Sequence, residues 1–252
     1  NVLWWLGACV LLWLGYVVAV GGDFMEFRFF VPVLPLGMTL VVWLVMQESW
    51  HATVRAALVL ALALGGVMAS WGHKSYGGVE SIAQLQGHLI NANENWMGVG
   101  QALGERFGGT ESPGVLIATT AAGAIPYYSG LDTVDMLGLN DAWVARHGLS
   151  AGARMGHQKL APYDYLIERG VNLVIGHPRV APEGQGQSSY TISDLEWFTL
   201  SPIEGAEVPD AARVLEVPLG EGYAVRVLYL VQHPRVEHAI AQGTVLVYPV
   251  VR

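Results

Sequence analysis

Charge is almost absent from the first 71 residues of this chain and is concentrated in the remainder. Those residues hold two of the 13 Lys and Arg and three of the 21 Asp and Glu. Apolar stretches fill the space between these charges, at residues 2–20, 29–46 and 56–71. A membrane-spanning helix needs about 20 apolar residues to cross a hydrocarbon core about 30 Å thick. The distribution predicts transmembrane helices in residues 1–71 and a soluble, extracytoplasmic α/β domain in residues 72–252.

The three apolar stretches predict about three membrane spans. Residues 2–20 contain no charged side chain. Pro32 and Pro35 interrupt the second stretch, where a membrane helix tolerates them near its start or at a kink. The third stretch is short and crosses the bilayer if it tilts little. Tryptophans lie mostly near the ends of the stretches, as interfacial aromatic residues do: Trp4, Trp5, Trp13, Trp43, Trp50 and Trp71.

The chain begins with Asn1 and enters an apolar stretch without the basic segment or cleavage site of a signal peptide. We therefore expect a C-terminal fragment of a longer protein, with further spans before it. Arg28 and Arg55 nearly balance under the positive-inside rule. The acidic C-terminal part decides the orientation, because such a domain suits export. We expect residues 21–27 and those after Trp71 to lie outside the cytoplasm, and residues 47–55 inside.

After residue 72 the apolar pattern becomes that of a mixed α/β domain. Residues 79–107 have helical spacing, which predicts one long or two broken amphipathic helices. A helix is also expected at residues 161–169, with Pro162 in its first turn and Gly170 at its end. Strand, helix and strand in succession imply a partly parallel sheet. The predicted strands are residues 115–119, 133–137 and 172–175, followed by antiparallel strands at 213–217, 223–231 and 244–250.

Composition excludes several classes of function. A net charge of −8 without a Lys or Arg cluster argues against nucleic acid as a partner. The single cysteine, Cys9, allows no intrachain disulfide. No P-loop, dinucleotide fingerprint or Gly-x-Ser-x-Gly motif is present, so we expect no cofactor. We also predict no metal site, because these histidines lack metal-ligand spacing: His73, His88, His147, His157 and His177.

Three charged residues follow the first apolar stretch, where a span leaves the membrane. Charges at this depth are costly unless they lie at the interface or bind a ligand. In a functional interpretation, Arg28 binds a lipid-linked phosphate while Asp23 or Glu26 contacts sugar hydroxyl groups. In the alternative, this segment is an interfacial turn with an Arg–Glu pair.

The motif Gly-Gly-Asp-Phe-Met-x-x-Arg-Phe-x-x-Pro at residues 21–32 resembles one in bacterial GT-C-type membrane glycosyltransferases, particularly the arabinofuranosyltransferase-like proteins of actinobacterial envelopes. Gly-Ala-Ile-Pro-Tyr-Tyr-Ser-Gly at residues 123–130 and Val-Asp-Met-Leu-Gly-Leu-Asn-Asp at residues 134–141 resemble their soluble-domain block. Gly156-His157-x-Lys159, followed by a Tyr-Leu-x-x-Arg helix, is similar to its continuation. The blocks occur in the same order.

This resemblance implies transfer of a sugar from a polyprenyl-phosphate donor to an envelope glycan acceptor. The implied partners are the lipid-linked donor, the glycan acceptor and membrane lipid. The implied location is the bacterial inner (cytoplasmic) membrane, as a multi-pass protein with its C-terminal domain outside the cytoplasm. The family's general base is an acid in the first outer loop of the full protein, which we expect to precede this chain. No catalytic residue is therefore assigned here, and Asp23 is not placed in that role.

Six downstream residues are candidates for the acceptor side: Tyr127, Asp135, Asn140, Asp141, His157 and Lys159. Asp135, Asn140 and Asp141 fall at a strand's carboxyl end and the start of the next helix, where α/β domains bind ligands. Asp141 as a helix N-cap and Asn140 as a turn residue are the structural alternatives. His157 and Lys159 fit either an anionic acceptor or a surface loop. A non-catalytic, membrane-anchored module that binds an envelope saccharide or protein is the alternative function.

The expected topology can be tested by cysteine labelling on intact cells, in a Cys9→Ser background. A reagent that does not cross the membrane should modify a cysteine at position 188, replacing Ser188, because that residue belongs to the domain outside. It should not modify one that replaces Ser49, in the inner loop. The reverse labelling pattern would contradict this orientation.

Overall fold

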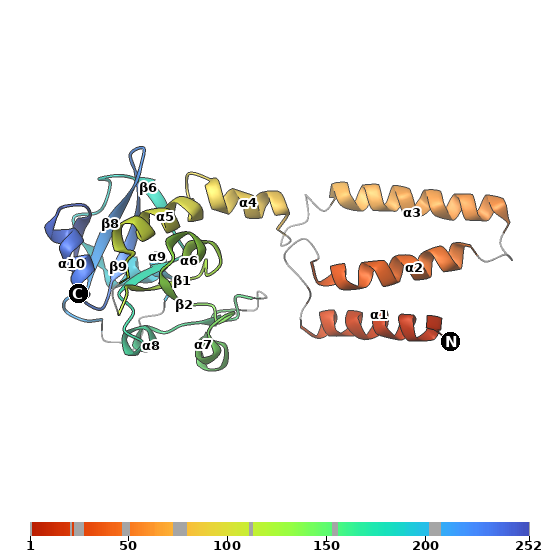
Figure 1. Ribbon diagram of the computed structural model, residues 1–252, viewed down its shortest axis with the longest axis horizontal. Coiled ribbons are helices and arrows are strands. Elements are labelled where there is room, and N and C mark those ends of the chain that lie inside the picture. The colour runs from red at the N-terminus through yellow and green to blue at the C-terminus, as the bar shows by residue number, and fades with distance from the viewer. Residues whose placement is uncertain are drawn as a thin grey trace. The chain divides into compact units, whose positions relative to one another are not determined.

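The computed structural model describes residues 2–20, 22, 28–46, 51–72, 80–110, 113–152, 156–201 and 208–251. The chain divides into two compact units, Asn1–Leu85 and Gln86–Arg252. The first unit is built from helices and the second from a sheet with helices on its faces (Figure 1). A mixed α/β domain therefore follows an apolar helical segment, as the sequence predicts.

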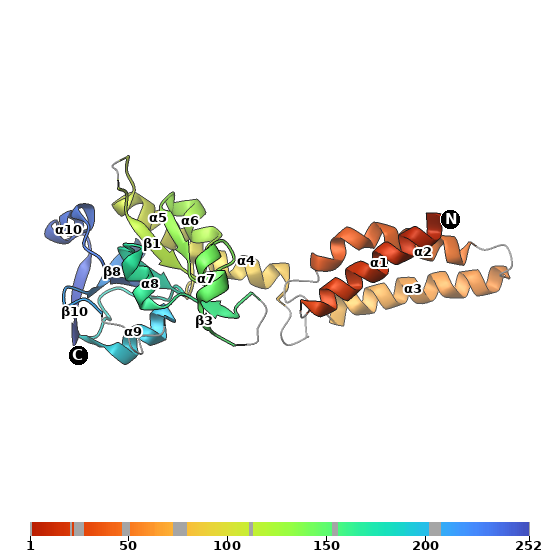
Figure 2. The same ribbon diagram turned by 90° about the horizontal axis from the view of Figure 1, so that it is seen from below.

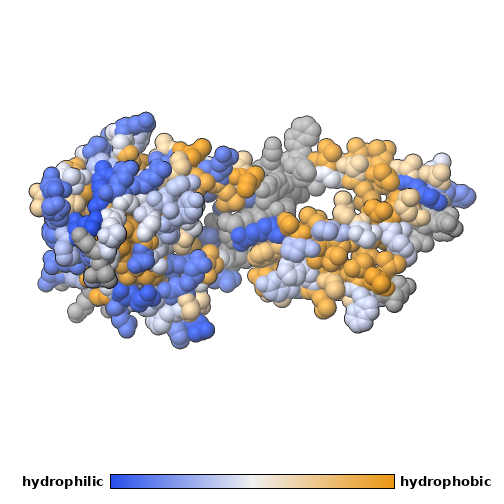
Figure 3. All heavy atoms as spheres, in the orientation of Figure 1, coloured by the Kyte–Doolittle hydropathy of each residue, from blue (hydrophilic) through white to orange (hydrophobic). Residues whose placement is uncertain are grey.

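The N-terminal unit contains helices α1 (Val2–Ala19), η1 (Arg28–Val33), α2 (Leu34–Val45) and α3 (Ala52–Gly72). The two prolines lie in η1 and in the first turn of α2, the positions where they cost least. By length and composition, Val2–Ala19 and Arg28–Val45 match membrane-spanning helices or a signal sequence, and the apolar part of α3 is shorter. Apolar residues dominate the visible surface of these helices (Figure 3).

The C-terminal unit is organised by an eight-stranded sheet in the order β2-β1-β5-β9-β8-β10-β7, with β6 also paired to β9. Strands β1 and β2 and strands β1 and β5 are parallel, whereas β5–β9, β9–β8 and β8–β10 are antiparallel. The bounds are β1 Leu116–Thr119, β2 Asp132–Asp135, β5 Leu173–Gly176, β6 Val180–Pro182, β7 Tyr190–Thr191, β8 Arg213–Gly220, β9 Tyr223–Tyr229 and β10 Leu246–Val251. A separate pair joins β3 (Leu149–Ser150) and β4 (Lys159–Leu160).

Helices cover both faces of this sheet because side chains alternate along each strand. Leu173 and Ile175 belong to one apolar core and Val174 to the other. The first core includes side chains of α5, α6 and α10, and the second includes side chains of α7, α8 and α9. Figure 2 shows α5 and α6 on one side of the strands and α9 on the other. The bounds are α4 Ile82–Ile90, α5 Trp96–Phe107, α6 Ala124–Ser129, α7 Ala142–His147, α8 Tyr163–Glu168, α9 Ile192–Thr199 and α10 Pro234–Ala241.

Strands β5 and β6 both pair with β9, and the segment between them forms a bulge. Val174 pairs with Leu228 and Val180 pairs with Val225. Residues 175–179 therefore occupy a stretch that only residues 226–227 span on β9. Gly176 has a φ of 61°, which favours glycine, and Pro178 has no N–H to donate to a neighbouring strand. The chain consequently leaves the sheet at the carboxyl end of β5.

The C-terminal unit should fold without the apolar helices, because its two cores make a domain of ordinary size for about 170 residues. A fragment of residues 78–252 should be soluble and should unfold in one cooperative thermal transition, followed by circular dichroism. Aggregation with exposed apolar surface, detected by dye binding, would show that the domain requires the helices.

Candidate functional site

A cleft of about 480 Å³ lies beside the bulge at the carboxyl end of β5. Open α/β sheets commonly bind ligands at this end of their parallel strands. The bulge contributes His177, Pro178 and Arg179, and the segment before α5 contributes Asn93 and Glu94. The remaining lining residues come from β6, β7 and its preceding segment, α9 and β9: Val180, Ala181, Gln187, Tyr190, Asp194, Trp197, Phe198 and Arg226.

Two histidines surround the carboxylate of Glu94. His88 Nδ1 lies 2.7 Å from Glu94 Oε2, and His177 Nε2 lies 3.8 Å from the same oxygen. The ring of His88 stacks on Trp96, and His177 meets Trp96 edge-on. Burial lowers the pKa of His177, although the Glu94 carboxylate acts in the opposite direction. The His88 contact fixes Glu94 at the cleft, and burial favours the neutral form of His177.

A buried ion pair lies under the cleft. Glu216 on β8 and Arg226 on β9 occupy facing positions, and Glu216 is only 1% exposed. Arg226 Nε lies 3.6 Å from Glu216 Oε2, and neither of these two atoms makes a hydrogen bond among the described residues. The other oxygen, Glu216 Oε1, accepts a hydrogen bond from the Gly184 N–H at 2.6 Å. The carboxylate is therefore anchored and positions the guanidinium.

Tyr190 has a buried hydroxyl group without a hydrogen-bond partner among the described residues. The residue is 2% exposed, and its ring packs edge-on against Phe198 and Tyr248. Burial raises the pKa of Tyr190, so the hydroxyl stays protonated at neutral pH. A protonated, unpaired phenol in the cleft wall can donate a hydrogen bond to a ligand.

Helix α9 forms the opposite wall. Thr191 and Asp194 make a capping box, in which the Asp194 carboxylate accepts hydrogen bonds from the Thr191 N–H and hydroxyl. These bonds lower the pKa of Asp194. One turn later, Trp197 is 63% exposed, and the Arg179 guanidinium lies 3.5 Å from its ring centroid. The wall therefore presents an aromatic face beside a cation.

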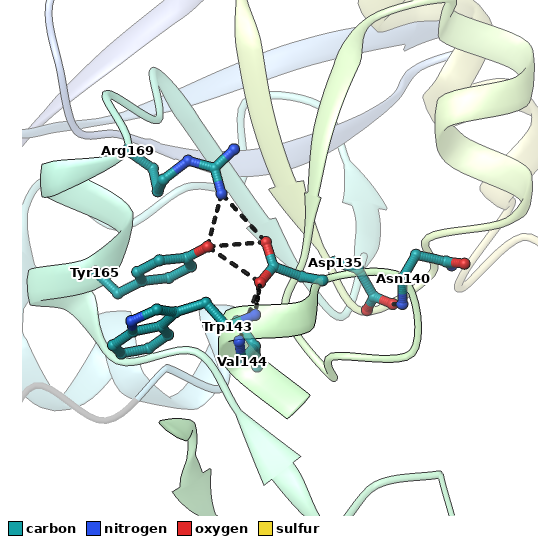
Figure 4. Close-up of polar contacts among 7 residues, drawn as sticks. Asp135, Asn140, Trp143, Val144, Tyr165 and Arg169 are labelled. Carbon is teal, nitrogen blue, oxygen red and sulfur yellow. Dashed lines mark hydrogen bonds and ion pairs between the residues drawn. The ribbon is translucent and has the colours of Figure 1, made fainter. Parts of the chain in front are cut away.

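Asp135 and Asp141 are two of the sequence-predicted residues. Their carboxylates accept hydrogen bonds from nearby backbone N–H groups. Asp135 is buried at the end of β2 and accepts hydrogen bonds from the N–H groups of Leu137 and Asn140, at 2.9 and 2.7 Å. Asp141 is the N-cap of α7 and accepts from Trp143 and Val144 at 3.0 Å (Figure 4). The N-cap interpretation of Asp141 is confirmed.

The same Asp141 carboxylate also ties α7 to α8. It accepts a hydrogen bond from the Tyr165 hydroxyl at 2.9 Å and pairs with Arg169 at 3.3 Å. Arg169 in turn donates to that hydroxyl at 2.6 Å, and the ring of Trp143 stacks on Tyr165 (Figure 4). Both oxygens of Asp141 are therefore engaged in holding helices together.

The other predicted residues are spread over the domain, and none of the six acceptor-side candidates lines the cleft. Tyr127 is 81% exposed beside Tyr128. Lys159 Nζ donates to the Gly148 carbonyl at 3.1 Å. His157 lies near enough to His177 to lower its pKa. On the N-terminal unit, the Arg28 guanidinium lies 5.2 Å from the Phe29 ring centroid, and Asp23 and Glu26 are outside the described residues.

Sequence reasoning missed the residues that form the cleft. Gly176-His177-Pro178 directly follows a predicted strand, which is a signal that could have indicated a ligand loop. Trp197 and Arg226 carry no such local signal, because only the folded sheet brings α9 and β9 to the same cleft.

Replacing Gly176 with Ala should destabilise the domain much more than replacing Gly170. Both glycines have positive φ, 61° and 72°, so alanine adds strain of about 1–2 kcal/mol at either position. A Cβ at Gly176 would also collide with the backbone of Thr199, whereas one at Gly170 would meet nothing within 4 Å. We expect a loss of about 3 kcal/mol or more for Gly176→Ala in urea denaturation. Equal losses would contradict the close approach of α9 to β5.

Comparison with known proteins gives a family for this domain. No curated protein and no solved structure matches the chain significantly. Residues 83–235 match a family described as a domain of unknown function, DUF8728. This match includes α5 to α9 together with the cleft. The chain therefore belongs to the DUF8728 family.

Proposed function

We propose that this chain is the C-terminal part of a polytopic membrane glycosyltransferase that uses a polyprenyl-phosphate sugar donor in cell-envelope glycan synthesis. In this proposal, the α/β domain binds the glycan acceptor in the cleft beside β5. The observation that carries it is the cleft itself, which combines an exposed aromatic face with charged and amide side chains. Sugars present apolar C–H faces and hydroxyl groups together, so such a lining suits them.

In this proposal, different residues of the cleft make different contacts with the saccharide. Trp197 offers a ring face for packing, and Arg179 limits access to it from one side. Asn93 and Gln187 offer amide groups that can donate and accept hydrogen bonds. Glu94 offers a carboxylate that His88 holds in place at 2.7 Å. A carboxylate that is held in one position can accept hydrogen bonds from sugar hydroxyl groups and so orient the saccharide.

The N-terminal unit supplies the membrane and donor side of this proposal. We assign three spans, to α1, to η1 with α2, and to α3, with the α/β domain outside the cytoplasm. The 21 residues of α3 extend about 31 Å at 1.5 Å each, a length that supports a third span. Arg28 binds the donor phosphate in this proposal, because the planar guanidinium group matches the arrangement of the phosphate oxygens.

A non-catalytic binding module is the second candidate. The observation that favours it is the occupation of the Asp135 and Asp141 carboxylates by structural hydrogen bonds. In that case the domain recognises an envelope saccharide without transferring a sugar.

Steady-state kinetics in membranes that contain the full-length protein can test the division between donor and acceptor sides. Trp197→Ala should raise the acceptor KM about five- to tenfold, because a packing face is lost, and should leave the donor KM unchanged. Arg28→Ala should instead raise the donor KM by at least tenfold, equivalent to about 1.5–3 kcal/mol for a charge-assisted contact. Arg28→Lys should fall between Arg28→Ala and the parent.

Leu246→Ala provides the control, because this exposed residue on β10 lies outside the cleft. It should change neither KM at equal protein abundance. Saccharide binding without any transfer would favour the binding module. The absence of both binding and transfer would refute the proposal.

A further inference from the structure

We propose that the saccharide bound in this cleft is acidic, and that Arg226, Arg179 and Tyr190 bind its carboxylate or phosphate group. This inference rests on the proposed function, because it names the chemical class of the acceptor. It comes from hydrogen-bonding groups in the cleft that make no hydrogen bond to the described residues.

The terminal nitrogens of Arg226 are available as hydrogen-bond donors. Its contact with Glu216 is made through Nε at 3.6 Å, and its terminal nitrogens make no hydrogen bond to a described residue. The side chain is 24% exposed and lines the cleft. A guanidinium presents five N–H donors in a planar fork, which matches the oxygens of a carboxylate or phosphate. Glu216 therefore orients a group whose outer donors remain available.

Tyr190 adds a second donor that is already desolvated. Its hydroxyl is buried and has no hydrogen-bond partner in the part of the chain that the structure describes, a state that costs free energy unless a ligand supplies an acceptor. Tyr190 and Arg226 line the same cleft, and the Arg226 charge acts on the pKa of Tyr190. A ligand oxygen at this position would satisfy the phenol and meet a positive charge.

Arg179 contributes a second guanidinium group to the same cleft. Val180 pairs with Val225, so Arg179 and Arg226 are each one residue away from this pair, and both line the cleft. Like charges that line one cleft repel each other. Arg179 packs on Trp197 and has no carboxylate partner among the described residues. An oxyanion bound near both guanidinium groups relieves this repulsion.

Each of the three carboxylates near the cleft has one oxygen that is held by a neighbouring group. Glu94 contacts His88 at 2.7 Å, and Asp194 accepts from the Thr191 N–H and hydroxyl at 2.8 and 2.7 Å. Glu216 accepts from Gly184. Arg179 and Arg226 carry more N–H donors than their described contacts use, and their positive charge favours an acceptor-rich anion over a cation.

The test measures binding of matched saccharides to the full chain in nanodiscs of zwitterionic lipid. One pair is tetragalacturonate and its methyl ester, which differ in charge but share a backbone. A second pair, mannose 6-phosphate and mannose, replaces the carboxylate by a phosphate. An acidic member should bind at least tenfold more tightly than its neutral counterpart, because hydrogen bonds to charged groups are stronger, and added salt should weaken it.

Tyr190→Phe is the decisive variant. It should weaken binding of the acidic saccharide about tenfold and leave its neutral counterpart unchanged. Its Tm should change little, because the hydroxyl has no hydrogen-bond partner among the described residues. Arg179→Gln and Arg226→Lys should also reduce the preference for the acidic member, since each removes a guanidinium fork.

Equal binding of both members of each pair would overturn this inference and leave the proposed glycosyltransferase intact. Binding of neither member would overturn it as well, and transfer to a neutral acceptor in membranes would then show whether the proposed function survives. A third arm uses vesicles of phosphatidylglycerol. If these bind at the cleft and the saccharides do not, the ligand is a lipid headgroup and the inference fails.

Discussion

The C-terminal domain depends on strand β5, which has a parallel neighbour on one edge and an antiparallel neighbour on the other. The buried side chain of Asn172 fixes both pairings where β5 begins. Its Oδ1 accepts a hydrogen bond from the Leu116 N–H at 2.8 Å, and its Nδ2 donates to the Val231 carbonyl at 3.0 Å. Because a buried amide is costly unless both ends are paired, these bonds select one alignment of β1, β5 and β9. A different register would leave the amide unsatisfied.

That alignment determines what happens at the other end of β5. Once the strand is in register, Gly176 turns the chain away from β9, and the bulge carries His177 and Arg179 to the cleft. Helix α9 can approach because Gly176 has no side chain where the Thr199 backbone lies. The Thr199 hydroxyl donates to the Leu195 carbonyl at 2.6 Å and lies 2.8 Å from the Tyr163 hydroxyl, whose pKa burial raises. The same packing that completes the core thus positions Trp197.

Local patterns in the sequence predict the elements of this fold better than the site. Long apolar stretches predict the N-terminal helices, and the place of Asp141 before a helix offers the N-cap role that the structure shows. Strand, helix and strand order predicts a partly parallel sheet, and the structure shows β1 parallel to β2 and β5. The cleft is different, because its lining comes from segments between Asn93 and Arg226 that meet only after the sheet forms. An arginine in a strand has the pattern of a solvent-facing position, and nothing local shows that Glu216 lies opposite it.

The chain is acidic overall, whereas the proposed anion site contains the guanidinium groups of Arg179 and Arg226, and distance decides which charges a ligand experiences. A net charge of −8 repels an acidic saccharide in solution. At physiological ionic strength, however, exposed charges are screened over about 8 Å, so most of this repulsion is lost before contact. Inside the cleft an anion meets the guanidinium groups of Arg179 and Arg226, and lower local polarity strengthens their attraction. An acidic domain can therefore bind an anion in a cleft where arginine N–H groups remain available to the ligand.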